Sequence, residues 1–147
     1  MMSNIQEGEI LLIEDNKNDK ELILRALKEY NLDEKVFSVK DGAEALDYIF
    51  TTGQYARRNT SLPKVIILDL KLPKVNGLEV LEAIRSHEQT RLLPVVVFTS
   101  SNQEEDKLKS YQLGTNSFVV KPIDYEQFFQ AVSQLGLYWL LLNQPAL

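Results

Sequence analysis

Side chains that can bind phosphate or metal directly follow four short apolar runs of this chain. In chain order, residues 10–13 precede Glu14 and Asp15, 65–68 precede Asp69, 95–98 precede Thr99, and 118–120 precede Lys121. If these runs are parallel strands, their carboxyl ends lie at one edge of one sheet, and the four groups converge there. Asp69 is the most informative of these residues, because it follows a run that reads as a fully buried strand.

Three carboxylates crowded at one sheet edge repel one another, so Glu14, Asp15 and Asp69 predict a bound hard cation. Mg²⁺ fits this oxygen donor set best, because it accepts one or two carboxylates, a carbonyl, waters and a phosphate oxygen. Lys121 can offset the remaining charge and contact a phosphoryl oxygen, while the Thr99 hydroxyl donates to another. The combination predicts a site that receives a phosphoryl group on Asp69 as an aspartyl phosphate.

Strand-like and helix-like periods alternate five times along the chain, which predicts five βα units. Apolar residues recur at helical spacing in each unit, including Leu108 and Tyr111 in the fourth predicted helix, which we expect to end at Gly114. Four helix starts carry a cap residue with Glu or Gln three positions later: Asp41 with Glu44, Asn76 with Glu79, Ser101 with Glu104, and Asp124 with Gln127.

This alternation predicts an α/β fold, a single doubly wound (βα)5 domain of flavodoxin-like type with helices on both faces of a parallel five-stranded sheet. Strand order 2-1-3-4-5 places the ends of strands one and three side by side at the switch point, where ligands bind. The second strand is followed by Lys40, Asp41 and Gly42, which predicts an edge strand and a plain helix cap away from the site.

The composition of the chain narrows its function classes. The chain has 147 residues, 44% of them hydrophobic, which suits one domain with a real core. Its 16 Lys and Arg against 21 Asp and Glu leave a net charge of -5 without a basic run, so direct nucleic-acid binding is not expected. It has no cysteine, no secretory signal and no apolar run long enough to cross a bilayer, so we expect a cytoplasmic protein without membrane attachment.

Two other classes of phosphate-binding protein share part of this pattern. A hydrolase of the haloacid dehalogenase type also uses a nucleophilic Asp, but it needs a second acid two residues later, where this chain has Lys71. A flavodoxin-type carrier of flavin mononucleotide needs a Ser, Thr or Gly loop after strand one. This chain has Glu14, Asp15 and Asn16 there, which would repel a phosphate unless a metal intervened.

Five segments, taken together in order and spacing, resemble the receiver domains of two-component response regulators. They are Glu14-Asp15, Asp69 within residues 68–73, Gly77 four residues after Pro73, Thr99-Ser100, and residues 118–122. The resemblance implies that Asp69 is the phosphoacceptor and Asp15 a direct Mg²⁺ ligand. It also implies that Glu14 acts through water and that the main-chain carbonyl of Lys71 completes the protein's metal ligands.

The resemblance also implies which residues reorient on phosphorylation and which partners the chain has. Thr99 and Phe118 would reorient on phosphorylation, Lys121 would contact the phosphoryl group, and the Lys121–Pro122 peptide bond would be cis. The phosphodonor would be a phosphohistidine on a sensor histidine kinase. The chain would be a signalling protein and not an enzyme, although it promotes its own phosphorylation and dephosphorylation. Its output would be a protein contact at helix four, strand five and helix five; the alternative is a phosphorylation-independent receiver-like interaction module.

Finer features resemble the stand-alone regulators that partner bacterial phytochromes, notably in cyanobacteria. These features are residues 12–16, the polar connection of residues 51–64, and Tyr138-Trp139-Leu140. We expect one receiver domain over residues 1–147, with a core of about 8–135 and an apolar helical extension at 136–147. Residues 137–142 are too apolar all round for the predicted core to cover, which predicts a homodimer through helix four, strand five, helix five and the extension. The alternative is that the extension folds back on its own sheet.

Overall fold

The computed structural model describes residues 8–59 and 61–146, so residues 1–7, 60 and 147 of the expected domain lie outside the described residues. In chain order the strands and helices are β1 (Ile10–Ile13), α1 (Lys17–Lys28), β2 (Val36–Val39), α2 (Gly42–Phe50), β3 (Val65–Leu68), α3 (Gly77–Ser86), β4 (Val95–Thr99), α4 (Glu104–Gln112), β5 (Ser117–Val120) and α5 (Tyr125–Gly136). Three short helical segments are η2 (Asp33–Lys35), η3 (Gly53–Tyr55) and the π-helical η4 (Leu137–Leu142). Within the described residues, no helix has the length and apolar character needed to span a membrane.

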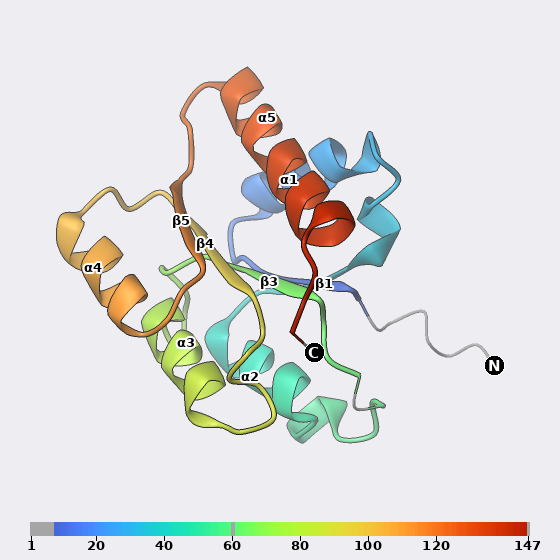
Figure 1. Ribbon diagram of the computed structural model, residues 1–147, viewed down its shortest axis with the longest axis vertical. Helices are drawn as coiled ribbons and strands as arrows, with labels where there is room; N and C mark the ends of the chain where they lie inside the picture. Colours follow the sequence, from blue (N-terminus) through green and yellow to red (C-terminus); the bar gives the residue numbers. More distant parts are fainter. Residues whose placement is uncertain (1–7, 60, 147) are drawn as a thin grey trace.

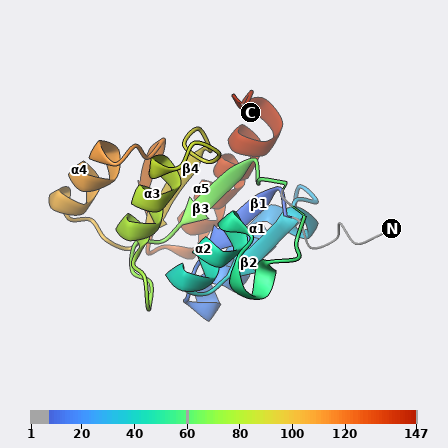
Figure 2. The ribbon, with the colours of Figure 1, turned by 90° about the horizontal axis from the view of Figure 1, so that it is seen from below.

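The five strands form one parallel sheet in the order β2-β1-β3-β4-β5, which confirms the predicted α/β fold and strand order (Figures 1 and 2). The register brings the carboxyl ends of the central strands together. Leu68 of β3 pairs with Ile13 of β1 on one side and with Val97 of β4 on the other. Thr99 at the end of β4 pairs with Val120 of β5. The residues that follow these positions therefore share one edge of the sheet.

Successive strand residues point to opposite faces of the sheet, and each face has its own core. Helices α1 and α5 cover one face, while α2 and α3 cover the other (Figures 1 and 2). The α2/α3 core contains Leu11, Ile13, Ile66, Leu68, Val95 and Val97, and the α1/α5 core contains Ile10, Leu12, Val65, Ile67, Val96 and Phe98. Because β1, β3 and β4 are buried on both faces, their sequences are continuous apolar runs.

Three of the four predicted helix caps are confirmed. The side chains of Asp41, Asn76 and Asp124 each accept a hydrogen bond from the backbone N–H three residues later. The prediction for Ser101 is wrong, because α4 begins at Glu104 after Gln103, whose side chain makes no capping bond. The Ser101 hydroxyl instead donates to Asp106 Oδ2 at 2.5 Å, so it ties the residues after β4 to the first turn of α4.

The predicted apolar face of α4 is also wrong. Leu108 and Tyr111 are 59% and 50% exposed, and the buried residue of this helix is Ser110. The Ser110 hydroxyl donates to the carbonyl of Asp106 at 2.8 Å, so the helix satisfies its own buried polar group. Helix α4 lies beside the edge strand β5 and α3, where it needs little apolar surface. Gly114 follows its end with φ of 96°, in agreement with the predicted stop.

The segment after α5 is helical, as predicted, but its turns are π-helical. Trp139 and Leu140 pack against the α1/α5 core, so part of this extension does fold back. Tyr138, Leu141 and Leu142 remain 50%, 59% and 67% exposed. The core therefore covers one side of the extension and leaves a second apolar side uncovered.

The start of α2 lies against the loop between β3 and α3. The Gly42 N–H donates to the Pro73 carbonyl at 3.3 Å, and the Lys74 ammonium lies 3.7 Å from Asp41 Oδ2. A Cβ atom added at Gly42 would lie 1.8 Å from the carbonyl oxygen of Val75, so only glycine permits this approach. The predicted edge strand and helix cap are therefore present, and the cap also supports the loop that follows Asp69.

We expect Gly42→Ala to lower the free energy of unfolding by ~2 kcal/mol or more, because backbone atoms block the new methyl group. Gly136→Ala is the matched control. Its Cβ would lie 2.6 Å from Leu27 Cδ2, the end of a flexible side chain, and should cost less than ~1 kcal/mol. Urea unfolding of both variants measures the difference, and equal losses would contradict the proposed backbone contact.

Candidate functional site

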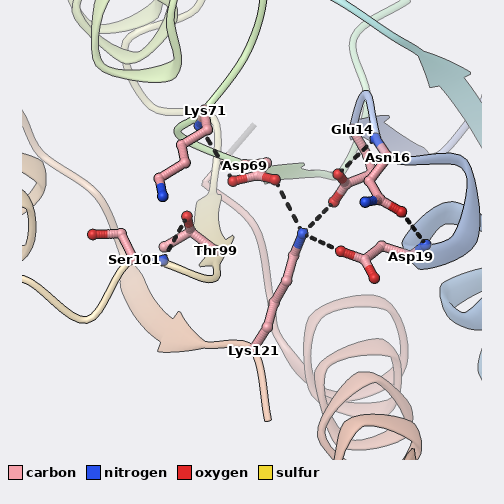
Figure 3. Close-up of polar contacts among 8 residues, drawn as sticks. All are labelled: Glu14, Asn16, Asp19, Asp69, Lys71, Thr99, Ser101 and Lys121. Carbon is pink, nitrogen blue, oxygen red and sulfur yellow. Dashed lines mark hydrogen bonds and ion pairs between the residues drawn. The ribbon is translucent and has the colours of Figure 1, made fainter. Parts of the chain in front are cut away.

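The predicted site residues meet at the carboxyl edge of the sheet (Figure 3). Glu14 and Asp15 follow β1, Asp69 follows β3, and Lys121 follows β5. One carboxylate oxygen from each acid lies within 4.8 Å of the others, so Glu14, Asp15 and Asp69 form an acidic cluster. The convergence predicted from the ends of the apolar runs is therefore present.

The Lys121 ammonium lies among three carboxylates (Figure 3). Its Nζ atom is 2.8 Å from Glu14 Oε1, 2.7 Å from Asp19 Oδ2 and 3.0 Å from Asp69 Oδ2. The lysine side chain is only 7% exposed. Burial alone would lower the pKa of Lys121, but the hydrogen bonds to Asp19 and Glu14 outweigh burial and raise the pKa above its usual value. The lysine is therefore a permanent cation at this edge.

Glu14 is the most deeply buried acid of the cluster, with 1% of its side chain exposed. Burial raises the pKa of Glu14 to about 7, against the opposing effect of Lys121. Both of its oxygens have partners, because Oε1 accepts from Lys121 and Oε2 accepts from the backbone N–H of Asn16 at 3.1 Å. Asp15 is exposed and makes none of the hydrogen bonds or ion pairs found among the described residues. The Asp15 oxygens are therefore more available to bind a cation than those of Glu14.

Asp69 is only 5% exposed, and each of its two carboxylate oxygens accepts a hydrogen bond. Oδ1 accepts from the backbone N–H of Lys71 at 3.3 Å, and Oδ2 accepts from Lys121. The Lys71 contact places the start of the β3–α3 loop directly beside the acidic cluster (Figure 3). A hollow of about 500 Å³, lined by Asp15, Lys71 and Asp106 among others, opens there.

The donor set suits a hard divalent cation. Three carboxylates supply oxygen ligands, and Lys121 does not neutralise all of their charge. Asp15 faces solvent, which leaves room for the waters that Mg²⁺ keeps when it binds. The residues present therefore fit the cation that the sequence predicts.

Thr99 and Phe118 lie beyond the acidic cluster. Thr99 is fully buried, lies on the side of Asp69 away from Glu14, and accepts a hydrogen bond from the Ser101 N–H at 3.3 Å (Figure 3). Phe118 is half-buried and packs against the α2/α3 core, in register with Val97 of β4. Thr99 and Phe118 therefore lie on the neighbouring strands β4 and β5, on this side of the site.

Asp19 was not predicted as a site residue. It stands in the first turn of α1, where an acid is commonly explained by the helix dipole. No local pattern distinguished it, because Asp15 lies before α1 and the contact of Asp19 is with Lys121, which is distant in the sequence. Its contact with Lys121 joins helix α1 to the strand-end residues.

The predicted cis bond between Lys121 and Pro122 is wrong, because no described peptide bond is cis. The chain bends instead at Ile123 and Asp124 before α5 begins. The trans isomer is the one that an X–Pro bond prefers by about 0.5–1 kcal/mol. Lys121 reaches all three carboxylates from this trans backbone.

The fold and the site together define a doubly wound α/β domain with its binding groups at the carboxyl ends of parallel strands. The family model for the response regulator receiver domain matches residues 10–133. The chain belongs to this family.

Three related proteins are similar to this chain over most of its length. Response regulator Rcp1 of Synechocystis is 36% identical over 131 residues, covering 89% of this chain and 88% of its own. A Mn²⁺-bound structure of Rcp1 matches with a TM-score of 0.87 and 34% identity over 94% of this chain and 98% of that one. The phosphorylated cyanobacterial phytochrome response regulator RcpA matches with a TM-score of 0.87 and 39% identity over 94% and 97%. The bacteriophytochrome response regulator RtBRR is 53% identical, with a TM-score of 0.74 over 92% of this chain and 82% of that one.

We expect Asp15→Ala to weaken Mg²⁺ binding by about tenfold or more, and Glu14→Gln to weaken it less. The reason is that Asp15 is exposed with available oxygens, whereas both oxygens of Glu14 already accept hydrogen bonds. Calorimetric titration with Mg²⁺ measures both affinities, with Glu21→Gln, an exposed acid of α1, as the control. Equal losses for the two cluster variants would show that Glu14 ligates as directly as Asp15.

Proposed function

We propose that this chain is a phosphoacceptor response regulator, and that Asp69 receives a phosphoryl group from a phosphohistidine of a sensor histidine kinase. One observation carries the proposal: Asp69 is a buried carboxylate at a strand end, held between the Lys71 N–H and the Lys121 ammonium. Those two donors orient the carboxylate and stabilise negative charge beside it. A carboxylate held in one orientation needs no reordering before attack, and attack by a carboxylate is a known route to a covalent intermediate.

In the proposed transfer, a carboxylate oxygen of Asp69 attacks the phosphorus atom and forms an O–P bond. The N–P bond to the donor imidazole breaks, and the imidazole nitrogen keeps the electron pair and takes up a proton. The product is an aspartyl phosphate. Lys121, already 3.0 Å from Asp69 Oδ2, is placed to donate to a phosphoryl oxygen, and the Thr99 hydroxyl is the candidate for another.

Mg²⁺ is the proposed cofactor, held by Asp15, Asp69 and the main-chain carbonyl of Lys71, with Glu14 acting through water. When bound, it would neutralise charge on the transferring phosphoryl oxygens. The acidic cluster supports this assignment, and so does the Mn²⁺-bound structure of Rcp1. The residues of this chain provide the orientation: the Lys71 N–H fixes one oxygen of Asp69 and Lys121 the other.

The output proposed for this site is a change of the surface formed by α4, β5 and α5. A phosphoryl group adds roughly -1.5 to -2 charges and strong acceptor oxygens beside Asp69. Thr99 would move towards it and give up its contact with the Ser101 N–H, and Phe118 would move into the space that opens. We further propose that the kinase partner is a phytochrome, on the similarity to RcpA, Rcp1 and RtBRR.

A homodimer through this surface and the extension is proposed on the apolar residues left exposed there. They are Leu108, Tyr111, Val120, Tyr125, Tyr138, Leu141 and Leu142. A hollow of about 340 Å³ at the extension is lined by Tyr138 together with Val119, Leu135 and Trp139 among others. Exposed aromatic and aliphatic side chains next to an apolar hollow are favoured anchors of protein interfaces.

We expect Asp69→Asn to abolish phosphorylation, because the amide keeps the shape of the side chain and removes the nucleophile. Mass spectrometry after incubation with acetyl phosphate and Mg²⁺ measures the gain of one phosphoryl group. Glu34→Gln, an exposed acid before β2 at the opposite edge of the sheet, should label like the parent protein. Full labelling of Asp69→Asn would refute the assignment, and an unlabelled parent protein would favour the phosphorylation-independent module.

We expect the full chain to sediment as a dimer at micromolar concentration, and a variant that ends at Gly136 to dissociate at least tenfold more readily. The truncation removes Tyr138, Leu141 and Leu142 from the proposed interface. Analytical ultracentrifugation with and without beryllofluoride measures both states. A full-length monomer at high concentration under both conditions would defeat the proposal.

A further inference from the structure

The carboxylate nearest to the Lys121 ammonium does not come from a strand end. Asp19 Oδ2 lies 2.7 Å from Nζ, compared with 2.8 Å for Glu14 and 3.0 Å for Asp69. Asp19 comes from the first turn of α1 and lies outside the acidic cluster (Figure 3). Its side chain is 27% exposed, whereas those of the other two partners are almost fully buried.

The geometry creates a competition for ligands. A lysine ammonium has three N–H donors, and here each has one carboxylate partner. Two of these partners, Glu14 and Asp69, also belong to the cluster that suits a divalent cation. A cation that binds there interacts with two of the carboxylates that hold Lys121. Asp19 is the partner that the lysine can keep.

The position of Asp19 is fixed by its own helix. Its backbone N–H donates to Asn16 Oδ1 at 2.9 Å, which is the N-cap bond of α1. The carboxylate is thus presented from a capped, ordered first turn. It can hold the ammonium on the α1 side independently of the strand-end acids.

We propose that Asp19 is a positioning residue that keeps the Lys121 ammonium on the α1 side of the site, away from the oxygens that bind the divalent cation. The inference rests on the proposed metal site and adds a residue that sets its affinity. Without Asp19, the ammonium would bind Glu14 and Asp69 alone and compete with the cation for both. Asp19 therefore acts on the cation through Lys121, and its effect must disappear when the lysine is absent.

The experiment measures Mn²⁺ affinity of the full chain from the electron paramagnetic resonance signal of free Mn²⁺. Asp19→Asn should weaken binding by about tenfold. Glu21→Gln removes the same charge from an exposed position of α1 and should change the affinity by less than about twofold. In the Lys121→Met background, Asp19→Asn should have no larger effect than Glu21→Gln. Circular dichroism checks folding, and Lys121→Gln replaces Lys121→Met if the latter does not fold.

The outcomes separate this inference from the proposed function. An unchanged affinity in Asp19→Asn overturns the inference, as does an equal loss in the presence and absence of the Lys121 ammonium, which indicates only long-range charge. Asp15→Ala is measured in the same titration. If it retains full affinity, the metal site itself is wrong and the inference falls with it. If it loses affinity while Asp19 and Lys121 show no coupling, only the inference is wrong.

Discussion

The ion pairs of Lys121 are the interaction on which the carboxyl edge of the sheet depends. Carboxylates within 4.8 Å of one another repel by roughly 3 kcal/mol at an effective dielectric constant near 20. The ammonium offsets part of this repulsion through its contacts with Glu14, Asp19 and Asp69. The relief is incomplete, because burial and, to a smaller extent, the charge of Asp69 still raise the pKa of Glu14 to about 7 despite Lys121. The unneutralised charge makes the same edge receptive to a cation.

The sheet brings the carboxylates close together and also fixes the backbone that carries them. Parallel pairing in register places the ends of β1, β3 and β4 side by side, and these strands are buried on both faces. The loop after Asp69 is held between two helix starts, because Gly42 approaches Val75 and the Gly77 N–H donates to the Leu70 carbonyl at 2.9 Å. A side chain at either glycine would collide with backbone atoms. The backbone that carries Asp69 is therefore fixed, which limits how far the acids can move apart.

The fold and the convergence of the site were predictable because both follow from local patterns. Continuous apolar runs identify doubly buried strands, and the group after each run must lie at the carboxyl edge. The contacts that were missed depend on how elements approach one another. From the sequence alone, Asp19 resembles an ordinary first-turn acid, because its contact depends on the position of α1 beside Lys121. Gly42 likewise resembles part of an ordinary helix cap, because its contact depends on the position of the β3–α3 loop. Leu108 and Tyr111 kept helical spacing, but spacing alone does not tell a buried face from an exposed one.

Helix α4 is the element best suited to transmit a change at this site. It buries Ser110, while α3 buries Gly77, Val80, Leu81 and Ile84, so displacing α4 exposes far less apolar surface. It is nevertheless connected to the strand ends, because Thr99 accepts from the Ser101 N–H and the Ser101 hydroxyl donates to Asp106 of α4. A movement of Thr99 therefore acts directly on the helix with the weakest anchorage. The exposed Leu108 and Tyr111 would move with it, so under the proposed function phosphorylation at the buried edge would change an apolar surface.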